Sequence, residues 1–255
     1  MTSKLDTLLT LLKNHANPRN VEGMARFGIV GEGRLGISMP VLRTIARETG
    51  KDHPLALALW NTRIPEAMIV ASMVADPAAM SEEEMEAWAS AFNSWDVCDQ
   101  TCLNLFVRSP SAWKMVRRWS GRKEEFVRRA AFALIACLAV HDTAADDKRF
   151  AGALRLIVKA ADDERNFVRK AVNWALRGTG KRNLALHAAA LTTARSLLKR
   201  TSRTARWIAA DAIKELENPS IRLRIKPSKA VKPHTPRKPA GSSPKKPRSA
   251  RTRTR

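Results

Sequence analysis

Apolar residues recur along the first 216 residues at intervals of three and four positions, the period of a helix with one buried face. Alternating runs of β-branched residues between turn residues, which are typical of strands, do not occur there. We therefore predict an all-α fold made of short, closely spaced helices. The expected helices are Lys4–Asn14, Val21–Phe27, Pro40–Thr49, His53–Trp60, Ile64–Val74, Ser81–Ala91, Trp95–Val107, Ser111–Trp119, Glu124–Val140, Asp146–Lys159, Asn166–Arg177, Asn183–Thr193 and Ser202–Glu217.

One helix sequence occurs twice. Phe126–Ala130 (Phe-Val-Arg-Arg-Ala) returns 41 residues later as Phe167–Ala171 (Phe-Val-Arg-Lys-Ala), and Arg203–Ala209 resembles a third copy about 38 residues further on. A period near 40 residues with two helices per unit is typical of HEAT-like repeats. Such units stack into a curved solenoid whose concave side is a binding surface. An irregular helical bundle is the alternative.

The composition changes after Leu216. Residues 219–255 contain seven of the 13 prolines and 13 Lys or Arg, but no Asp or Glu and few large apolar residues. A segment of this kind cannot bury a core. We therefore predict two parts, a HEAT-like α-solenoid domain over residues 1–218 and a disordered Lys/Arg/Pro-rich tail over residues 219–255.

Both parts carry excess positive charge. The formal net charge is +22, and the 13 cations of the tail leave +9 for residues 1–218. This charge favours a polyanionic partner such as DNA or RNA. A membrane role is the weakest interpretation, because no apolar run approaches the roughly 18 residues that span a bilayer. The N-terminus lacks the apolar stretch of a signal peptide, so we expect a cytoplasmic protein that associates with the nucleoid by binding DNA.

The sequence offers no pattern for a metal or a cofactor. Its three cysteines include no CxxC pair, and its histidines lie apart from them. The segment Gly31–Gly36 matches GxGxxG in letters, but no predicted strand precedes it. We therefore expect a monomer that works without metal or cofactor. The cysteines, which we interpret as small apolar residues, are Cys98, Cys102 and Cys137.

One group of side chains suggests chemistry. Trp95 and Asp99 are four residues apart in a predicted helix, so the indole and the carboxylate share one face. The two copies of the repeated helix supply cations, and the second copy also holds a tryptophan. An acid, two indoles and several cations along one basic groove are suited to acting on nucleic acid. These further residues are Arg128, Arg129, Lys170, Arg177 and Trp174.

The same residues also have a structural interpretation. Trp95 can be a core residue of its helix, as is expected of Trp60, Trp88, Trp113, Trp119 and Trp207. Asp96 and Asp99 can complement the dipole of a helix that Ser94 caps. The basic residues can form an ordinary solvated face. Composition and spacing leave both interpretations open.

Several fragments of the chain, taken in order, resemble the AlkD-like DNA alkylation repair proteins, which are HEAT-repeat DNA glycosylases. The resemblance covers most of residues 5–216. Such proteins remove alkylated purines, chiefly N3- and N7-substituted bases, and leave an abasic site without flipping the base into a pocket. The fragments are Met24–Phe27, Leu35–Pro40 with Arg43 following, Ser94–Asp99, Arg128–Ala131 and Lys170–Arg177.

The resemblance implies roles for individual residues. Asp99 corresponds to the catalytic carboxylate, and Trp95 and Trp174 to the aromatic pair that faces the deoxyribose. Phe27 stands at the third aromatic position, where the family often has tyrosine, and Arg129 corresponds to the residue that grips the backbone. The further DNA-binding candidates are Arg128, Lys170, Arg177 and Arg43.

The implied chemistry is consistent with a single carboxylate. An N3- or N7-alkylated purine is cationic, so it leaves without protonation, and an acid with aromatic faces stabilises the positive sugar. We therefore predict a glycosylase acting on alkylated double-stranded DNA. The main alternative is a catalytically silent HEAT-repeat protein that binds damaged or branched DNA. A helical scaffold for protein partners is a third interpretation.

Overall fold

The computed structural model describes residues 3–29, 32–225 and 227, and these contain helices but no strand. The predicted all-α fold is confirmed. The helices are α1 (Lys4–Asn14), α2 (Pro18–Ala25), α3 (Met39–Thr49), α4 (His53–Asn61), α5 (Pro65–Val74), α6 (Glu82–Ser90), α7 (Trp95–Asn104), a 3-10 turn η1 (Phe106–Arg108), α8 (Ala112–Trp119), α9 (Glu125–His141), α10 (Asp147–Ala160), α11 (Asn166–Gly180), α12 (Leu184–Leu198), α13 (Arg203–Leu216) and α14 (Pro219–Arg222).

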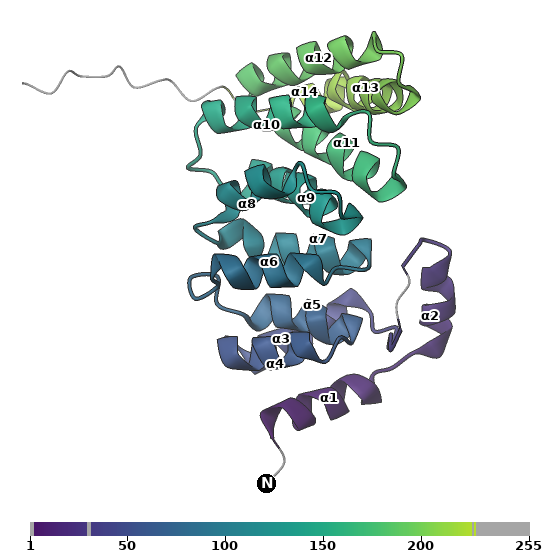
Figure 1. Ribbon diagram of the computed structural model, residues 1–255, viewed down its shortest axis with the longest axis vertical. Helices are drawn as coiled ribbons and strands as arrows, with labels where there is room; N and C mark the ends of the chain where they lie inside the picture. Colours follow the sequence, from purple (N-terminus) through teal and green to yellow (C-terminus); the bar gives the residue numbers. More distant parts are fainter. Residues whose placement is uncertain (1–2, 30–31, 226, 228–255) are drawn as a thin grey trace, which may run out of the picture.

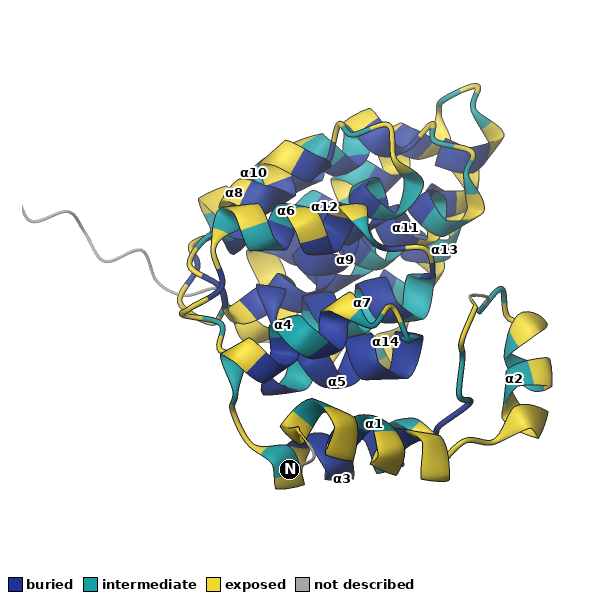
Figure 2. Cartoon of the chain, turned by 60° about the horizontal axis from the view of Figure 1, so that its bottom comes forward, coloured by how far each residue is buried: buried dark blue, intermediate teal, exposed yellow. Residues whose placement is uncertain are grey.

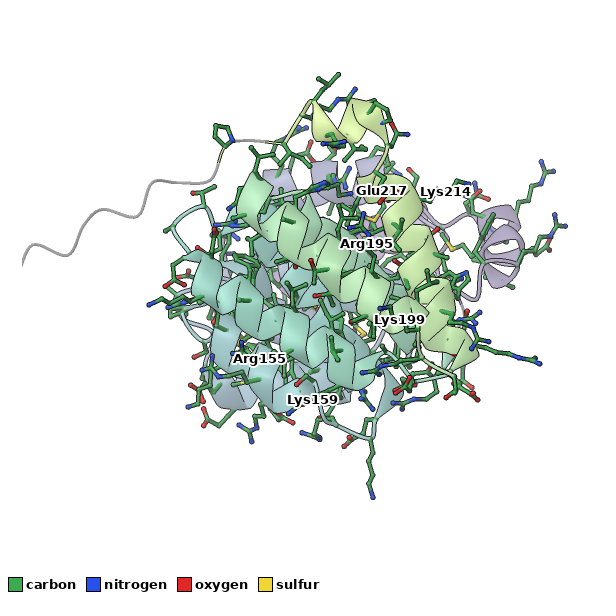
Figure 3. All side chains as sticks on the ribbon, turned by 90° about the horizontal axis from the view of Figure 1, so that it is seen from above. Arg155, Lys159, Arg195, Lys199, Lys214 and Glu217 are labelled. Atoms are coloured by element: carbon green, nitrogen blue, oxygen red, sulfur yellow. The ribbon has the colours of Figure 1, made fainter. Side chains whose placement is uncertain are left out.

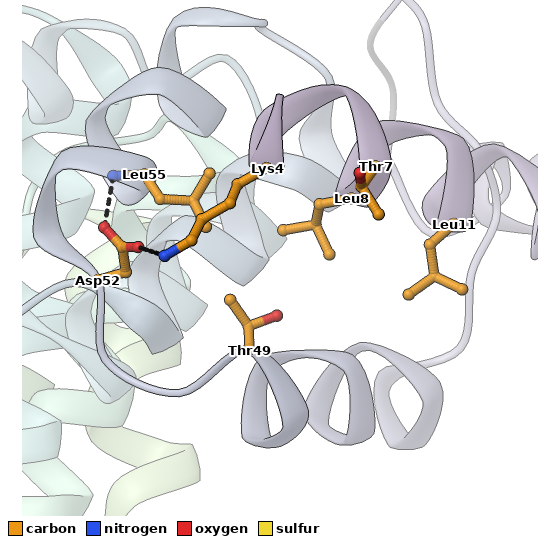
Figure 4. A pocket seen from close by; sticks show the side chains of 7 residues that line it. All are labelled: Lys4, Thr7, Leu8, Leu11, Thr49, Asp52 and Leu55. Carbon is orange, nitrogen blue, oxygen red and sulfur yellow. Dashed lines mark hydrogen bonds and ion pairs between the residues drawn. The ribbon is translucent and has the colours of Figure 1, made fainter. Parts of the chain in front are cut away.

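Short polar side chains fix where the helices begin. The Ser81 hydroxyl accepts from the backbone N–H of Glu84 at 3.1 Å, and the Glu84 carboxylate accepts from the N–H of Ser81 at 2.8 Å. This reciprocal capping box satisfies two donors that a helix start otherwise leaves unpaired. Asp52 caps α4 by accepting from the backbone N–H of Leu55 at 3.1 Å, and it also binds Lys4 of α1 at 3.1 Å, which ties the first helix to the stack (Figure 4).

The helices stack in pairs along the long axis of the molecule (Figure 1). The second helices of successive pairs, α5, α7, α9, α11 and α13, pack on one another and form an inner row. The first helices, α4, α6, α8, α10 and α12, form an outer row. At the centre, α9 buries 12 of its 17 residues. This arrangement confirms the predicted HEAT-like repeats, because neither row alone would bury its apolar face.

The repeated sequences occupy equivalent places. The Phe126 and Phe167 rings, at the starts of α9 and α11, lie 5.4 Å apart between centroids. In contrast, α2 stands at the edge of the stack with no buried residue (Figure 2). None of the described helices is long and apolar enough to cross a membrane.

Some helix boundaries differ from the prediction. Helix α2 starts at Pro18, because Asn17 accepts from the N–H of Asn20 at 3.3 Å and proline suits the first turn. The predicted helix Trp95–Val107 ends at Asn104 and continues as a 3-10 turn. Helix α12 runs to Leu198, beyond the predicted Thr193, since its buried face continues.

The predicted tail begins with ordered residues. Helix α14 and the buried Ile225 extend the described structure beyond Asn218, the predicted last residue of the solenoid. The Asn218 side chain caps α14 by accepting from the N–H of Ser220 at 2.9 Å. The rest of the predicted tail, residue 226 and residues 228–255, lies outside the described residues.

Candidate functional site

The centre of the site is an ion pair between two inner helices. Asp99, on α7, receives two hydrogen bonds from Arg129 on α9: Nε donates to Oδ1 at 2.9 Å, and Nη2 donates to Oδ2 at 2.7 Å. The Arg129 side chain is 7% exposed and that of Asp99 16%. The third Arg129 nitrogen, Nη1, donates to the Phe167 carbonyl of α11 at 2.6 Å. One guanidinium therefore joins three successive inner helices.

Burial shifts the ionisation of this pair. Burial raises the pKa of the Asp99 carboxyl, and the facing Arg129 guanidinium opposes that rise. Burial acts to lower the pKa of Arg129, but the charge of Asp99, its hydrogen bonds with Arg129 and the nearby cysteines together raise that pKa. Both carboxylate oxygens accept N–H bonds, an arrangement that fits the ionised form of the acid.

Trp95 lies beside this pair, one turn before Asp99 on α7. The Arg129 guanidinium carbon is 5.9 Å from the centroid of the Trp95 ring. The indole Nε1 donates to the Phe27 carbonyl at 3.1 Å, which fixes the ring and holds the end of the α2 segment. The structure thus brings Trp95, Asp99 and Arg129 together. The Phe27 side chain itself is 73% exposed.

Two residues that sequence reasoning missed hold this segment in place. Arg34 donates to both oxygens of Asp96, at 2.9 and 2.8 Å, and to the Ser94 hydroxyl at 3.2 Å. The buried Glu66 accepts from the backbone N–H groups of Leu35 and Gly36, at 3.0 and 2.8 Å. An acid inside the apolar run of α5 is the sequence signal that could have revealed Glu66.

The segment also depends on glycine. Gly36 has φ of +70°, and a Cβ there would lie 2.3 Å from the Asn17 carbonyl oxygen. Gly28 also has φ of +70°, and a Cβ there would lie 3.0 Å from the Phe167 ring. These positions favour glycine, because other residues rarely adopt such φ values. The segment after α2 therefore approaches the start of α11 closely.

The structural alternative for the acids of α7 is partly correct. Ser94 stands at the N-cap position, but its side chain makes no capping bond and instead donates to Asp96. Asp96, in the first turn, is neutralised by Arg34. Asp99 differs from Asp96 because it points toward the next repeat.

The other predicted DNA-binding residues are not all free. Arg128 pairs with Asp163 at 3.1 Å, and Arg177 pairs with Glu215 of α13. Lys170 is exposed and has no ion pair within the described part of the chain. Arg43, on α3, lines a separate hollow of about 280 Å³ together with other basic side chains. Of these four, Lys170 and Arg43 are the exposed cations without an ion pair in the described part of the chain.

Trp174, the second predicted indole, lies on α11. It is half-buried and lines a cavity of about 370 Å³ with Val140, Arg182 and other residues of α9, α11 and the following segments. It comes seven residues after Phe167, hence about 10 Å further along the helix axis at 1.5 Å per residue. The placement of Trp174 against the Asp99 carboxylate stays a prediction.

Metal ligands do not gather in the described part of the chain, where no group of three His, Cys, Asp or Glu could hold an ion. The three cysteines are buried. Cys98 and Cys102 donate weakly to the carbonyls of Phe126 and Ala130, at 3.7 and 3.6 Å. Burial raises the pKa of the Cys102 thiol, which suits a structural role.

Comparison with known proteins agrees with this fold. The family model described as DNA alkylation repair enzyme matches residues 8–216. No curated protein matches the sequence significantly. A solved structure from a family described as related to the HEAT-like repeat DNA glycosylases, with affinity for branched DNA structures, has a TM-score of 0.71 at 19% identity, covering 89% of this chain and 99% of its own. At this identity, the similarity establishes the fold.

Two further solved structures are more distant. An engineered protein has a TM-score of 0.41 at 14% identity, covering 85% of this chain and 99% of its own. A designed armadillo repeat protein in complex with the peptide (KR)4 has a TM-score of 0.35 at 18% identity, covering 88% of this chain and 87% of its own.

Proposed function

The chain belongs to the DNA alkylation repair enzyme family, and from this premise we propose that it is a DNA glycosylase. Its substrates would be positively charged N3- and N7-alkylpurines in duplex DNA. It would hydrolyse the glycosidic bond and leave an abasic site, using Asp99, Trp95 and Arg129 without metal or cofactor.

The observation that carries this proposal is the position of the Asp99 carboxylate. It is held by two charge-assisted hydrogen bonds beside an indole, yet 16% of its side chain remains exposed. Each carboxylate oxygen has two lone pairs, and Arg129 uses one on each oxygen. The remaining lone pairs can accept from a water molecule or face a sugar. Asp99 is therefore anchored by Arg129 and retains capacity to react.

The proposed reaction follows from this capacity. As the glycosidic bond breaks, its electron pair moves to the cationic base, which leaves neutral, and positive charge develops on the sugar. An anion and an aromatic ring placed beforehand against the sugar stabilise this charge. Asp99 then orients water for attack on the sugar carbon and takes the water's proton. Trp95 supplies the aromatic ring beside it.

The site favours lesions that carry their own charge. A neutral leaving base needs a proton. Among the described residues, the titratable side chain bound to Asp99 is the cationic Arg129. An arginine side chain does not act as a proton donor at neutral pH. We therefore expect release of 7-methylguanine and 3-methyladenine, but not of hypoxanthine or uracil.

The test is direct. Duplex DNA treated with a methylating agent is incubated with the protein under single-turnover conditions, and released 7-methylguanine and 3-methyladenine are measured. Asp99→Asn should lower the excision rate by a factor on the order of 10²–10³, the scale for losing one preorganised electrostatic group. The matched control is Asp163→Asn, which removes the acid paired with Arg128 and should keep the rate within about threefold. Equal rates for wild type and Asp99→Asn would contradict the proposed mechanism.

A second candidate function is DNA binding without excision. It is favoured by the closure of the Asp99–Arg129 pair in the free protein, since both carboxylate oxygens are already engaged. The relative with a similar fold has affinity for branched DNA. Under this alternative, the wild-type protein would bind branched or damaged duplexes tightly and release no base from methylated DNA.

A further inference from the structure

A second basic surface lies on the outer row. The helices α8 and α10 enclose a cavity of about 350 Å³, which we call the outer groove. Its floor includes Trp113 and Val116 of α8 and Leu156 of α10, and no acidic residue lines it. Five cations surround this floor: Arg117, Lys148, Arg149, Arg155 and Lys159.

The sequence of α10 produces this surface. Lys148, Gly152, Arg155 and Lys159 are spaced by four, three and four residues, so they lie on one face of the helix. Gly152 keeps the groove open, because it adds no side chain and a Cβ there would meet nothing nearer than Arg155 Nη2 at 3.6 Å. Sequence reasoning did not identify this face, since a run of cations on a helix is usually solvated.

The groove cations differ from their neighbours in being unneutralised. On a neighbouring face of α8, Lys114 pairs with Glu82 at 2.6 Å and Arg118 pairs with Glu86 at 3.3 Å. Within the described residues, none of the five groove cations has an ion pair. Arg149 instead places its guanidinium carbon 5.9 Å from the Trp113 ring. The five positive charges around the groove repel one another, and a bound polyanion would neutralise them and remove this repulsion.

We propose that the outer groove binds the phosphate backbone of a second DNA segment while the Asp99 surface holds the first. The two surfaces lie on different sides of the stack: α8 and α10 are far from α2, whose end is bound to Trp95 (Figures 1 and 2). Arg155 and Lys159 of α10 lie on the face of the molecule that also carries Lys199, the residue directly after α12 (Figure 3). The protein would thus join two duplex segments.

The dimensions and chemistry of the groove match a nucleic acid. Lys148 and Lys159 are 11 residues apart, a distance of about 16 Å along the helix. A duplex of that length carries about nine phosphate charges at one per 1.7 Å. A membrane surface fits less well, because interfacial helices insert large apolar side chains. The exposed large apolar residues of the described chain include none on α8 or α10.

This inference goes beyond excision and does not require it, because the groove contains none of the residues proposed for the glycosidic step. It is therefore tested with undamaged DNA. The Asp99→Asn experiment measures base release from methylated DNA, whereas the groove experiment measures binding of undamaged DNA. Each proposal can therefore fail without the other.

The experiment measures capture of a second duplex. Full-length protein is bound to a short immobilised duplex, and capture of a second, fluorescent duplex is followed as salt increases. The groove variant R155Q/K159Q is compared with the matched control K114Q/R118Q. The control also removes one Lys and one Arg charge, but from positions on α8 that are already ion-paired. Every protein keeps the C-terminal basic residues, so their contribution is the same throughout.

We expect R155Q/K159Q to weaken capture of the second duplex about tenfold or more and to reduce the log–log salt slope of that step by about two, for two lost phosphate contacts. The first duplex should bind as in the wild type, and K114Q/R118Q should capture normally. A second groove variant, R117Q/K148Q, should reproduce the loss. Thermal unfolding of each variant checks that it is folded.

Three results would overturn the proposal. Capture could be equal in wild type and both groove variants. The control could lose capture as much as the groove variants, which would indicate net charge alone. Finally, the groove variants could lose binding to phosphatidylserine vesicles while capture of DNA stays unchanged, which would assign the groove to a membrane.

Discussion

The starts of α9 and α11 have nearly the same sequence and very different surroundings. Both begin with Phe-Val followed by two basic residues, and their phenylalanine rings pack together at 5.4 Å. Yet Arg129 in the first copy is buried against Asp99, whereas Lys170 in the second copy is exposed. One motif thus supplies an interior ion pair in one repeat and a surface cation in the next.

The cause lies in the helix that precedes each copy in the inner row. Helix α7 offers Asp99 to α9, but α9 offers α11 no comparable acid, since its only acidic residue, Glu125, is in its first turn. A buried arginine is stable only with a partner. The repeated motif therefore determines how the repeats stack, and the neighbouring helix determines where a reactive pair can form.

Removing the cation from each copy should show the difference between Arg129 and Lys170 most clearly. Arg129→Met leaves the buried Asp99 without its partner, and it should lower the free energy of unfolding by about 3 kcal/mol. Lys170→Met removes an exposed charge and should change it by no more than about 0.5 kcal/mol. Chemical denaturation followed by circular dichroism measures both. Similar losses in the two variants would show that the Asp99–Arg129 pair is no more important than a surface charge.

The sequence predicted the helical fold well, because apolar spacing in α9 and α11 reports directly on burial. It also identified Asp99, Trp95 and Arg129, which the structure places together. It could not predict that Arg129 binds Asp99 on both oxygens, because side-chain direction depends on how the repeats stack. Arg34 and Glu66 were missed for a related reason: their partners are 62 and about 30 residues away.

The two copies of the motif should also differ in DNA binding, because Lys170 is exposed and Arg129 is buried. As an exposed cation without an ion pair, Lys170 is free to contact a phosphate, so Lys170→Gln should reduce the log–log salt slope by about one. Affinity near 0.1 M salt should fall about eightfold, regardless of DNA sequence. Lys181→Gln is the matched control, since Lys181 is already bound to Glu215 at 2.5 Å. Equal effects of the two substitutions would place the DNA elsewhere.

The indoles of α7 and α11 provide a smaller contrast. Trp95→Phe keeps an aromatic ring but loses the hydrogen bond to the Phe27 carbonyl, so the segment after α2 should become less stable by roughly 0.5–1 kcal/mol. Faster amide hydrogen exchange at residues 24–29 would report this change. Trp174→Phe, in the separate cavity, should leave that exchange unaltered. Unchanged exchange in Trp95→Phe would mean that the hydrogen bond does not hold the segment.

The smallest expected effect concerns the acids that bind the two adjacent arginines of α9. Burial raises the pKa of Asp99, the partner of Arg129. Burial acts in the same direction on Asp163, the partner of Arg128, but the hydrogen bonds from Arg165 and the charges of Arg165 and Arg128 together lower the pKa of Asp163. The two carboxyl groups should therefore give opposite dependences of stability on pH.

A carboxyl whose pKa is raised by folding holds its proton more tightly in the folded chain, so its contribution to stability falls as pH rises from about 3.9 through the raised value. A carboxyl with a lowered pKa gains stability as pH rises toward and above about 3.9. The difference in unfolding free energy between wild type and Asp99→Asn should therefore decrease with pH, and that between wild type and Asp163→Asn should increase. Urea unfolding at several pH values between about 3.5 and 7 measures both slopes across this range. If both differences increase with pH, the attraction of Arg129 exceeds the cost of burying Asp99, and the two arginines hold their acids in the same way.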